Sequence, residues 1–466
     1  MKTTIERELK FEADDIQIDR LGGEPLEPHT FASSYHDTAD RRLSRAGITL
    51  RRRVENGMSN WQLKLPSGES RLELEEPGGP AEPPPGLAKL LSGILRGSQL
   101  ELIATLETRR HGRLVEGVEV TIDDVSVLEG MSVVRRFSEI EAELVNGSPA
   151  SIEQVDEALR GMGATPGTKT PKIMRVVGLP SIPRVDPKAP ALEHVCGFVR
   201  AQLDELRAND PIVRATDEAD AIHDMRVAVR RLRAVLRTAR PMLERAWSDS
   251  LRHELDLFGE LLGPVRDLDV LMEHLTDEAR ELGAGDSDTE ALLAPLRSER
   301  DRARTRLREA LDDQRYFLLL DRLETAAGSL PVTRVDLTVE QLAGREFKKL
   351  RALEKRTTRT DDRQLHKLRI QSKRARYAAE LAQSSRGAPA ARFVKDSTKL
   401  QDVLGGHQDA VVALDRLRQL AKAVGSTGAA FTAGRIAERE AGRKLQARRD
   451  MSKAWKRVRR RGKAAW

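Results

Sequence analysis

The sequence predicts an α+β protein of two domains, with a β-rich N-terminal half and an all-α C-terminal half made of two similar helical bundles. Short segments of alternating polar and apolar residues recur up to Leu144, which is typical of strands with one buried face. Four prolines then fall within residues 179–190, a density that no helix tolerates. Beyond this linker, helical periodicity continues almost to Trp466, and the motifs on it occur twice.

Six strands are expected in the first half, separated by turn-forming residues such as those of Asn56-Gly57. The expected strands are Ile5–Phe11, Ile48–Val54, Trp61–Leu65, Arg71–Glu75, Val118–Asp123 and Ser138–Leu144. Helices are expected over Leu87–Leu95 and Ile152–Met162, and helix breaks in the second half near residues 283–287, 328–331, 386–389 and 425–428. The predicted organisation is a first domain over 1–178, a linker over 179–190, a helical domain over 191–460 and a basic tail over 461–466.

The net charge of +7 is unevenly distributed between the two halves. Residues 1–180 hold 23 Lys and Arg against 29 Asp and Glu, a net of −6, so residues 181–466 carry +13. An acidic half favours cation binding, and a basic half favours a polyanionic partner. The single cysteine, Cys196, excludes an internal disulfide framework. Because the start is charged and no apolar run is long enough for a membrane span, we expect a cytoplasmic protein without a signal peptide.

Charged residues of both signs recur at alternating positions on the predicted strands of the first half. They are Glu6, Glu8, Lys10, Arg51, Arg53, Lys64, Asp123, Glu139, Glu141 and Glu143, and Arg109 and Lys172, outside the predicted strands, complete the set. One such strand is usually a solvated face, but the recurrence favours a barrel interior with a cationic wall and an acidic wall. Such an interior is costly unless a charged ligand fills it. A triphosphate with a divalent cation, held by Arg, Lys and carboxylate oxygens, is the expected occupant.

The alternation leaves several assignments open, because a shift of one residue exchanges the two faces of a strand. Arg52 competes with Arg51, and Arg110 competes with Arg109. The acidic pair is either Glu139 with Glu141 or Glu141 with Glu143, and the final lysine is Lys172 or Lys169. No G-x4-G-K-[ST] motif occurs in the sequence, which argues against a P-loop nucleotidase.

Two copies of the pattern H-x2-R-x3-[RK]-R-x-R predict two basic helix faces. In each copy the positions i, i+3, i+7 and i+10 lie within about 80° of one another, opposite an apolar stripe. The first copy contains His223, Arg226, Arg230 and Arg233, and the second contains His366, Arg369, Lys373 and Arg376. A further motif, Leu262-Gly263-Pro264-Val265-Arg266-Asp267, recurs as Leu404-Gly405-Gly406-His407-Gln408-Asp409 and is expected to form turns.

The two motifs repeat at offsets of 143 and 142 residues, which indicates an internal duplication into two similar bundles. Two facing basic stripes predict a cationic groove for a polyanion, with His223, His366 and His407 beside it as hydrogen-bond donors. No cysteine and no close-spaced histidine cluster accompany these histidines, so a zinc site is not expected.

The ordered set of barrel residues resembles the CYTH domain family, the triphosphate tunnel metalloenzymes, over about residues 1–178. The resemblance is carried by Glu6-x-Glu8-x-Lys10, Tyr35-His36-Asp37-Thr38, Leu50-Arg51-Arg52-Arg53, Leu63-Lys64, Glu139-Ile140-Glu141 and Lys172. It implies an antiparallel eight-stranded tunnel barrel that uses Mg²⁺ or Mn²⁺ to hydrolyse triphosphates. By this resemblance, the metal ligands are Glu6, Glu8, Glu139 and Glu141, and the catalytic residues are Glu6, Glu8 and Lys10. The implied substrate-binding residues are Lys10, Arg51, Arg53, Lys64, Arg109, Asp123 and Lys172.

The second half resembles the CHAD family, the conserved histidine α-helical domain, over about residues 191–460. The resemblance implies two four-helix bundles related by a pseudo-two-fold axis, with a basic central cavity that binds inorganic polyphosphate. The implied binding residues are His223, Arg226, Arg230, Arg233, Arg266, His366, Arg369, Lys373, Arg376 and His407. Gln408 stands where the first copy has Arg266, so the two ends of the groove are not expected to be equivalent.

We therefore expect metal-dependent hydrolysis of inorganic triphosphate or polyphosphate in the barrel, with capture of the chain by the helical half. Thiamine triphosphate and nucleotides present the same phosphates, and the sequence does not separate these substrates. The alternative is a non-catalytic polyphosphate-binding protein that is targeted to phosphate granules. Nucleic acid is not an expected partner, because aromatic residues make up only 3% of the chain and offer few stacking platforms. A membrane partner is not expected either.

Overall fold

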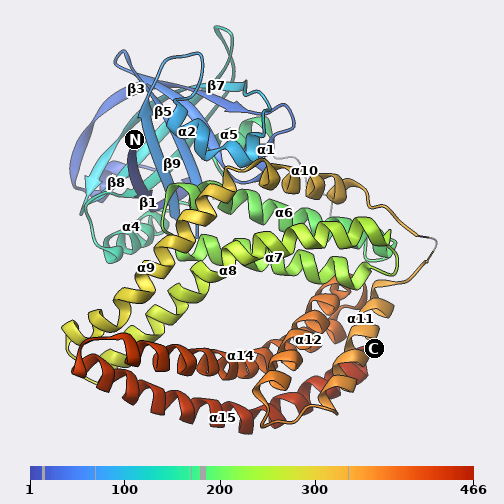
Figure 1. The fold of residues 1–466 in the computed structure, drawn as a ribbon. Helices are drawn as coiled ribbons and strands as arrows, with labels where there is room; N and C mark the ends of the chain where they lie inside the picture. Colours follow the sequence, from blue (N-terminus) through green and yellow to red (C-terminus); the bar gives the residue numbers. More distant parts are fainter. Residues whose placement is uncertain (13–15, 69, 169, 179–184, 334) are drawn as a thin grey trace. The chain divides into compact units, whose positions relative to one another are not determined.

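The computed structural model describes residues 1–466 except 13–15, 69, 169, 179–184 and 334. The chain divides into two compact units, as Figure 1 shows. One consists of Met1–Ile182 and Arg207–Asp217, and the other of Pro183–Leu206 and Glu218–Trp466. Part of the predicted linker, residues 179–184, lies outside the described residues, and so does Lys169, the alternative to Lys172.

The first unit is built on one antiparallel sheet, which contains nine strands among the described residues. The strands are β1 (Lys2–Glu6), β2 (Glu8–Glu12), β3 (Glu24–Asp37), β4 (Thr49–Glu55), β5 (Met58–Ser67), β6 (Ser70–Pro77), β7 (Glu101–Val115), β8 (Val118–Glu129) and β9 (Ser132–Leu144). Their order in the sheet is β1-β6-β5-β4-β3-β7-β8-β9-β2. All the predicted strands are present, whereas β3 and β7 were not predicted. Strand β3 contains two prolines and shifts register twice against β7, which obscures its alternation.

The two edges of the sheet are consecutive pieces of the N-terminal segment, separated only by Arg7. Strand β1 pairs with β6, and β2 pairs with β9. The amide of Leu144 donates a hydrogen bond of 3.0 Å to the Arg7 carbonyl at the break. The sheet therefore curls until its edges meet on this segment. Because the segment is divided into β1 and β2, the sheet has nine strands where the resemblance implied eight.

Helices flank the sheet and determine which residues face its interior. They are η1 (Ile18–Leu21), α1 (Arg42–Arg45), α2 (Pro85–Leu90), α3 (Ser92–Leu95), α4 (Pro149–Gly161) and α5 (Lys172–Val177). Helix α4 packs Ile152 and Leu159 against a core that includes Ile140 of β9. The residues that alternate with Ile140 must therefore face the interior of the curled sheet. Helix α5 packs Ile173 with Tyr35 on this interior side, which brings its first residue, Lys172, inside.

The described part of the second unit is almost all helical. Its helices are α6 (Ala191–Ala215, of which residues from Arg207 onward belong to the first unit), α7 (Ala219–Ala239), α8 (Arg245–Glu281), α9 (Asp286–Leu311), α10 (Gln314–Gly328), α11 (Val339–Glu354), α12 (Asp362–Leu381), α13 (Gln383–Arg386), α14 (Ala388–Ala423) and α15 (Thr427–Ala465). The four predicted breaks, near residues 283–287, 328–331, 386–389 and 425–428, are present. The breaks that follow α6, α7, α9 and α11 were not predicted. Four long helices, α6 to α9, are followed by a second such set formed by α11, α12, α14 and α15, which confirms the predicted pair of bundles.

The repeated motifs occupy corresponding helices of the two sets. The two histidine-arginine patterns lie on α7 and α12, which are in contact with each other. The two Leu-Gly motifs lie inside α8 and α14, so the prediction that they form turns is wrong. Leu262 and Leu404 are buried there and hold the helices in their cores. Gly405 lies beside Arg369 of α12, whose guanidinium is 4.0 Å from the position that a Cβ would occupy.

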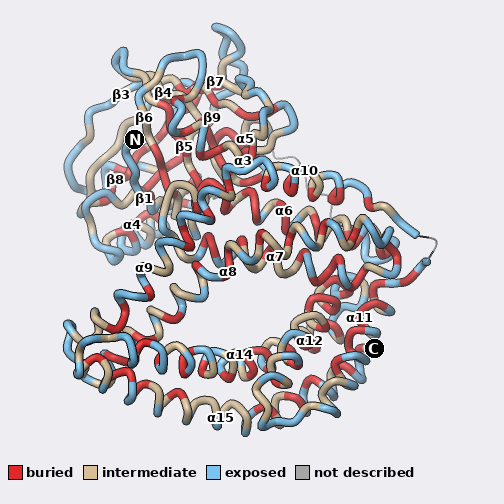
Figure 2. Tube along the Cα trace, in the orientation of Figure 1, coloured by how far each residue is buried: buried red, intermediate tan, exposed pale blue. Residues whose placement is uncertain are grey.

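One apolar core joins α11, α12, α14 and α15, and Figure 2 shows buried residues recurring along these helices. Phe347 and Leu368 contribute from α11 and α12, Phe393 from α14, and Trp455 and Val458 from α15. The segment predicted as a basic tail, residues 461–466, continues α15 as far as Ala465.

Candidate functional site

A cavity of about 180 Å³ lies inside the curled sheet, and most of the residues around it are charged. Its lining consists of Glu6, Glu8, Lys10, Tyr35, Thr49, Arg51, Arg53, Gln62, Lys64, Arg71, Glu73, Glu75, Arg110, Glu141, Glu143, Pro171 and Lys172. A single water needs only about 10–15 Å³. The cavity therefore has room for a ligand, and the alternation along each strand selects the residues that face it.

One side of the cavity is rich in carboxylates. Lys64 Nζ donates to both carboxylate oxygens of Glu6 at 2.7 Å and lies 3.6 Å from Glu73 Oε1. Burial, together with a hydrogen bond to Glu73, nevertheless raises the pKa of Glu6. Burial and the nearby Glu6 carboxylate also raise the pKa of Glu143, to about 7. One lysine therefore does not neutralise the negative charge on this side.

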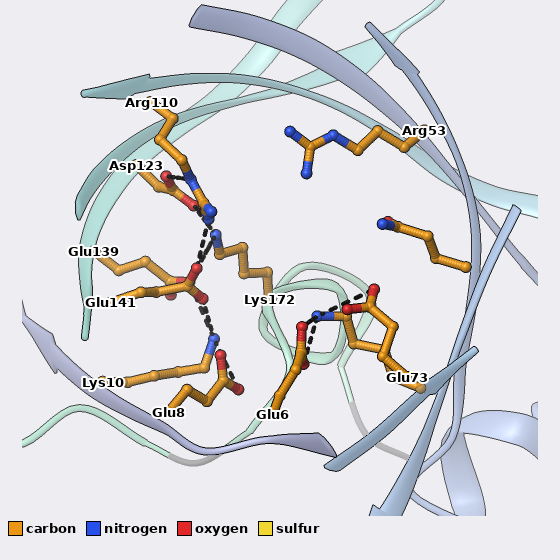
Figure 3. A network of polar contacts seen from close by, with 12 residues as sticks. Glu6, Glu8, Lys10, Arg53, Glu73, Arg110, Asp123, Glu139, Glu141 and Lys172 are labelled. Atoms are coloured by element: carbon orange, nitrogen blue, oxygen red, sulfur yellow. Dashed lines mark hydrogen bonds and ion pairs between the residues drawn. The ribbon is translucent and has the colours of Figure 1, made fainter. Parts of the chain in front are cut away.

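Lys10 connects the carboxylates of β2 and β9, as Figure 3 shows. Its ammonium group hydrogen-bonds Glu141 and lies 3.7 Å from Glu8 and 3.5 Å from Glu139. Burial alone would lower the pKa of Lys10, but these three carboxylates outweigh it and raise that pKa. Lys10 is therefore a fixed positive charge at the end of the acidic side.

Asp123 is fully buried and anchors two further cations. Arg110 donates from Nε and Nη2 to its two oxygens, at 2.6 and 2.7 Å, and from Nη2 to Glu141 at 2.6 Å. Lys172 hydrogen-bonds Asp123 and lies 3.3 Å from Glu141. Asp123 thus orients the two cations that line the cavity without lining it itself.

Strand β4 supplies the opposite, cationic wall. Arg51 donates to Gln62 at 2.6 Å and to the Tyr35 hydroxyl at 3.2 Å, and it makes no ion pair with a described residue. Arg53 pairs with Glu55 at 2.7 Å. Burial and the charge of Arg51 lower the pKa of Arg53. Figure 3 shows Arg53 extending from its strand across the open space from Glu141.

The strand register resolves the two arginine pairs that the sequence left open. Arg51 lines the cavity, whereas Arg52 lies on the other face of β4 and donates to Ser59 at 2.8 Å. Arg110 lines the cavity, whereas Arg109 is exposed on the outside. The prediction that Arg109 faces the interior is therefore wrong, because the inward positions of this part of β7 have even numbers.

Glu139, a predicted metal ligand, lies outside the cavity lining. It is almost completely buried, 3.3 Å from Lys172 and 3.0 Å from Arg175. Glu139 therefore serves as a counter-ion behind the residues that line the cavity. Glu143, the alternative to it, does line the cavity.

Two further carboxylates, those of Glu73 and Glu75, line the cavity without having been predicted to do so. The signal was present in the sequence, because Arg71-Leu72-Glu73-Leu74-Glu75 alternates charge with leucine in the same way as the N-terminal strand.

The chemistry of these side chains fits a hard divalent cation. The predicted metal ligands are Glu6, Glu8, Glu139 and Glu141. In the described structure, no three of these four residues place a carboxylate oxygen within 4.8 Å of one another. Buried Glu73 Oε1 has no hydrogen-bond partner in the described part of the chain. Carboxylate oxygens are the ligands that Mg²⁺ and Mn²⁺ prefer. A cation would offset both the burial and the neighbouring Glu6 charge that raise the pKa of Glu143.

His274, Glu278 and Glu440, from α8 and α15, form the group of described residues whose potential ligand atoms do approach within 4.8 Å. Their charges are already paired. His274 Nε2 lies 2.8 Å from Glu440, and Arg439 Nε lies 2.9 Å from Glu278. Arg443 forms ion pairs with both glutamates. We therefore assign no metal to this group.

A second charged cavity, of about 450 Å³, lies between α7, α8 and α12. Its lining, here called the basic groove, consists of Arg226, Val229, Arg230, Arg233, Ala234, Arg237, Arg252, Gly259, His366, Arg369, Ile370, Lys373, Arg374 and Tyr377. No acidic residue is among them. Arg237, Arg252 and Arg374 were not predicted, although Arg237 continues the α7 stripe one turn beyond Arg233.

The positive charges of the basic groove destabilise one another. Burial and the neighbouring charges of Arg230, Arg369 and Arg226 lower the pKa of Lys373 to about 7. Burial and the neighbouring charge of Arg237 lower the pKa values of Arg252 and Arg374. An anion in the groove would relieve this repulsion.

Four predicted polyphosphate-binding residues lie outside the lining of the basic groove. His407 is buried on α14, where it lies 3.1 Å from Asp362. Arg376 turns back to Glu380, to which it donates at 2.9 Å. The side chains of both residues are therefore engaged elsewhere.

His223 and Arg266 are the other two of these residues. Burial and the nearby charge of Arg266 lower the pKa of His223, which is one turn from Arg226 along α7. They therefore adjoin the basic groove at its Arg226 end.

Each half of the chain matches a known protein family. The CYTH domain model matches residues 4–173, and the CHAD domain model matches residues 197–418. The uncharacterized protein Rv2226 of Mycobacterium tuberculosis is 30% identical over 453 residues, which cover 87% of this chain and 85% of that protein. No helix in the described part of the chain has the length and apolar character required to span a membrane.

Several solved structures are similar to parts of the chain. PptA from Streptomyces chartreusis is 20% identical with a TM-score of 0.49, covering 57% of this chain and 100% of its own. The CHAD domain from the plant Ricinus communis is 23% identical with a TM-score of 0.48, covering 60% and 95%. CYTH-domain proteins are metal-dependent tunnel enzymes with triphosphatase or cyclase activity, and CHAD domains are linked to polyphosphate. The chain belongs to the family of proteins in which a CYTH domain is followed by a CHAD domain.

Proposed function

We propose that the protein is a metal-dependent phosphohydrolase that cleaves inorganic triphosphate or polyphosphate in the sheet cavity and binds polyphosphate in the basic groove. The observation that carries this proposal is that carboxylates and guanidinium groups face each other across one cavity, with neither set fully neutralised by its neighbours. Glu6, Glu8 and Glu143 face it from one side, and Arg51 and Arg53 face it from the other. A simple anion site would have no use for the carboxylates, and a simple cation site would have no use for the arginines.

The substrate class follows from the cationic wall. Arg51, Arg53 and Arg110 offer guanidinium groups that match the oxygens of successive phosphoryl groups. Lys10 of β2 and Lys172 of α5 add point charges from the opposite side of the cavity. A linear chain of phosphoryl groups, with one negative charge or more on each unit, is complementary to this arrangement. The basic groove of the helical unit favours inorganic phosphate chains over nucleotides, because it offers positive charge and few aromatic surfaces.

Glu6, Glu8, Glu141 and Glu143 are the residues that would hold Mg²⁺ or Mn²⁺, with Glu73 beside them. The cation would neutralise phosphate oxygens and lower the pKa of a water molecule. Transfer of a terminal phosphoryl group to water needs orientation and charge stabilisation more than covalent help. Arg51 and Arg53 orient the chain, and Lys10, fixed by its three carboxylates, stabilises charge that develops on the phosphate oxygens.

A second candidate function is polyphosphate binding without hydrolysis, with location at phosphate granules in the cytoplasm. The observation that favours it is the basic groove, which contains no residue of the sheet cavity and no acidic residue. This alternative predicts chain binding that does not depend on divalent cations.

Replacing Glu6 and Glu8 together by glutamine should abolish metal-dependent hydrolysis. We expect phosphate release from tripolyphosphate with Mn²⁺ or Mg²⁺ to fall by roughly 100-fold or more, because the cation loses two anionic ligands. Steady-state phosphate release is the measurement. Glu107→Gln/Glu129→Gln, which removes two exposed carboxylates from the same sheet, is the matched control and should keep wild-type activity. Absence of metal-dependent release from the wild-type protein, with polyphosphate still bound, would favour the non-catalytic alternative.

The strand register can be tested with two neighbouring arginines. Arg51→Gln should lower kcat/KM for tripolyphosphate by about 10- to 100-fold, because it removes a charge-assisted contact worth about 1.5–3 kcal/mol. Arg52→Gln should have little effect, because Arg52 lies on the other face of β4. Equal losses for the two variants would contradict the assignment of Arg51 to the cavity wall.

Polyphosphate binding to the basic groove should weaken as the pH rises. In the free protein the pKa of Lys373 is about 7, and a bound polyanion would raise that pKa, so binding takes up a proton. We expect the affinity of wild-type protein for long-chain polyphosphate to fall roughly tenfold between pH 7 and 8.5. Isothermal titration of Lys373→Met should show weaker and nearly pH-independent binding, whereas Arg233→Met should weaken binding and keep the pH dependence. The same pH dependence in Lys373→Met would show that another group takes up the proton.

A further inference from the structure

The C-terminal part of α15 presents a dense row of exposed positive charge. Residues 451–466 include seven Lys and Arg and no Asp or Glu. Six of these cations are exposed: Lys453, Lys456, Arg457, Arg459, Arg460 and Lys463. At 100° per residue they occupy an arc of about 160°, and buried Trp455 and Val458 lie on the opposite side of the helix.

The neighbouring helix α14 extends this surface. Arg392, Lys395 and Lys399 follow one another at i, i+3 and i+7, and all three are exposed. Arg461 of α15 donates to Asp396 of α14 at 3.1 Å, which brings these parts of the two helices together. We call the three residues of α14 and the six exposed cations of α15 the outer basic face. None of the nine makes an ion pair with a residue that the structure describes.

The outer basic face is separate from the basic groove. Helix α12 turns Arg369 and Lys373 toward the groove and Leu368 toward the apolar core. Helix α15 contributes Trp455 and Val458 to the same core. The two cationic surfaces therefore lie on opposite sides of one bundle.

The composition of the outer basic face identifies the kind of anion that it fits. Solvated helix faces usually mix both signs of charge, because like charges at i, i+3 and i, i+4 repel one another. Lys453 and Lys463 lie about 15 Å apart along the helix axis, so the cations form an extended row. The face exposes no aromatic ring for base stacking, since Trp455 is buried. These properties suit a linear, featureless polyanion better than a nucleic acid.

We propose that the outer basic face is a second binding site for long-chain inorganic polyphosphate, distinct from the basic groove. This inference rests on the proposed polyphosphate-binding function. A chain long enough to pass around the bundle occupies both sites, and the second contact then forms at the high effective concentration of a tethered ligand. A chain shorter than the roughly 20 Å thickness of two helix layers occupies only one site.

The test compares binding of long-chain polyphosphate and of tripolyphosphate to full-length variants. The outer-face variant is Lys453→Gln/Lys456→Gln/Arg457→Gln/Arg460→Gln. Its matched control removes four exposed arginines from α8 and α9, as Arg280→Gln/Arg297→Gln/Arg302→Gln/Arg306→Gln. The groove variant is Arg369→Gln/Lys373→Met. Thermal denaturation should show that the outer-face variant is folded, because all four side chains are exposed and repel one another.

We expect the outer-face variant to bind long chains at least tenfold more weakly than wild type and to bind tripolyphosphate as well as wild type does. The control variant should resemble wild type with both probes. Wild-type affinity of the outer-face variant for long chains, with binding lost in the groove variant, would overturn this inference and leave the proposed function intact. Failure of wild-type protein to bind long chains would overturn both. Tighter binding of duplex DNA than of long-chain polyphosphate, lost in the outer-face variant, would assign the face to nucleic acid instead.

Discussion

Carboxylates crowded on one side of the sheet cavity impose the main constraint on this structure. Burying like charges together is costly, and the cost falls only if opposite charges or a bound ligand compensate for it. Lys10 and Lys172 form ion pairs with Glu139 and Glu141 and so compensate their negative charge. Nearer the open space, the pKa of Glu143 remains raised to about 7. The fold thus holds charges in place that a divalent cation and a phosphate chain would neutralise together.

The curled sheet makes this arrangement possible because its strands supply charge on one face only. Apolar residues such as Ile140 and Val120 pack under α4 on the outside, so their charged neighbours must point inward. The helical unit solves a similar problem differently. Its basic groove is formed by the polar sides of α7 and α12, whose apolar sides are buried in the bundle cores. In both units an apolar core keeps like charges close together.

Much of this could be predicted from the sequence. Strict alternation predicted the strands that carry Glu6, Glu8, Arg51 and Arg53, and the duplicated motifs predicted two bundles with facing basic helices. Alternation could not decide between Arg109 and Arg110, because two adjacent arginines fit either register. Alternation also does not show which inward-facing residues of a strand reach the cavity, so it could not show that Glu139 lies outside the cavity lining. The Leu-Gly motifs resembled turns because glycine and proline dominate local signals, but buried leucines keep α8 and α14 helical through them.

The incompletely neutralised carboxylates of the sheet cavity should bind a divalent cation. Thermal denaturation of wild type and Glu143→Gln at pH 8, with and without Mn²⁺, tests this binding most directly. Without metal, Glu143→Gln should be the more stable protein, because one crowded negative charge is gone. Mn²⁺ should raise the midpoint of wild type more than that of the variant, since it binds only the folded cavity. A wild-type midpoint that does not respond to Mn²⁺, or a metal-free variant that is less stable than wild type, would contradict the account.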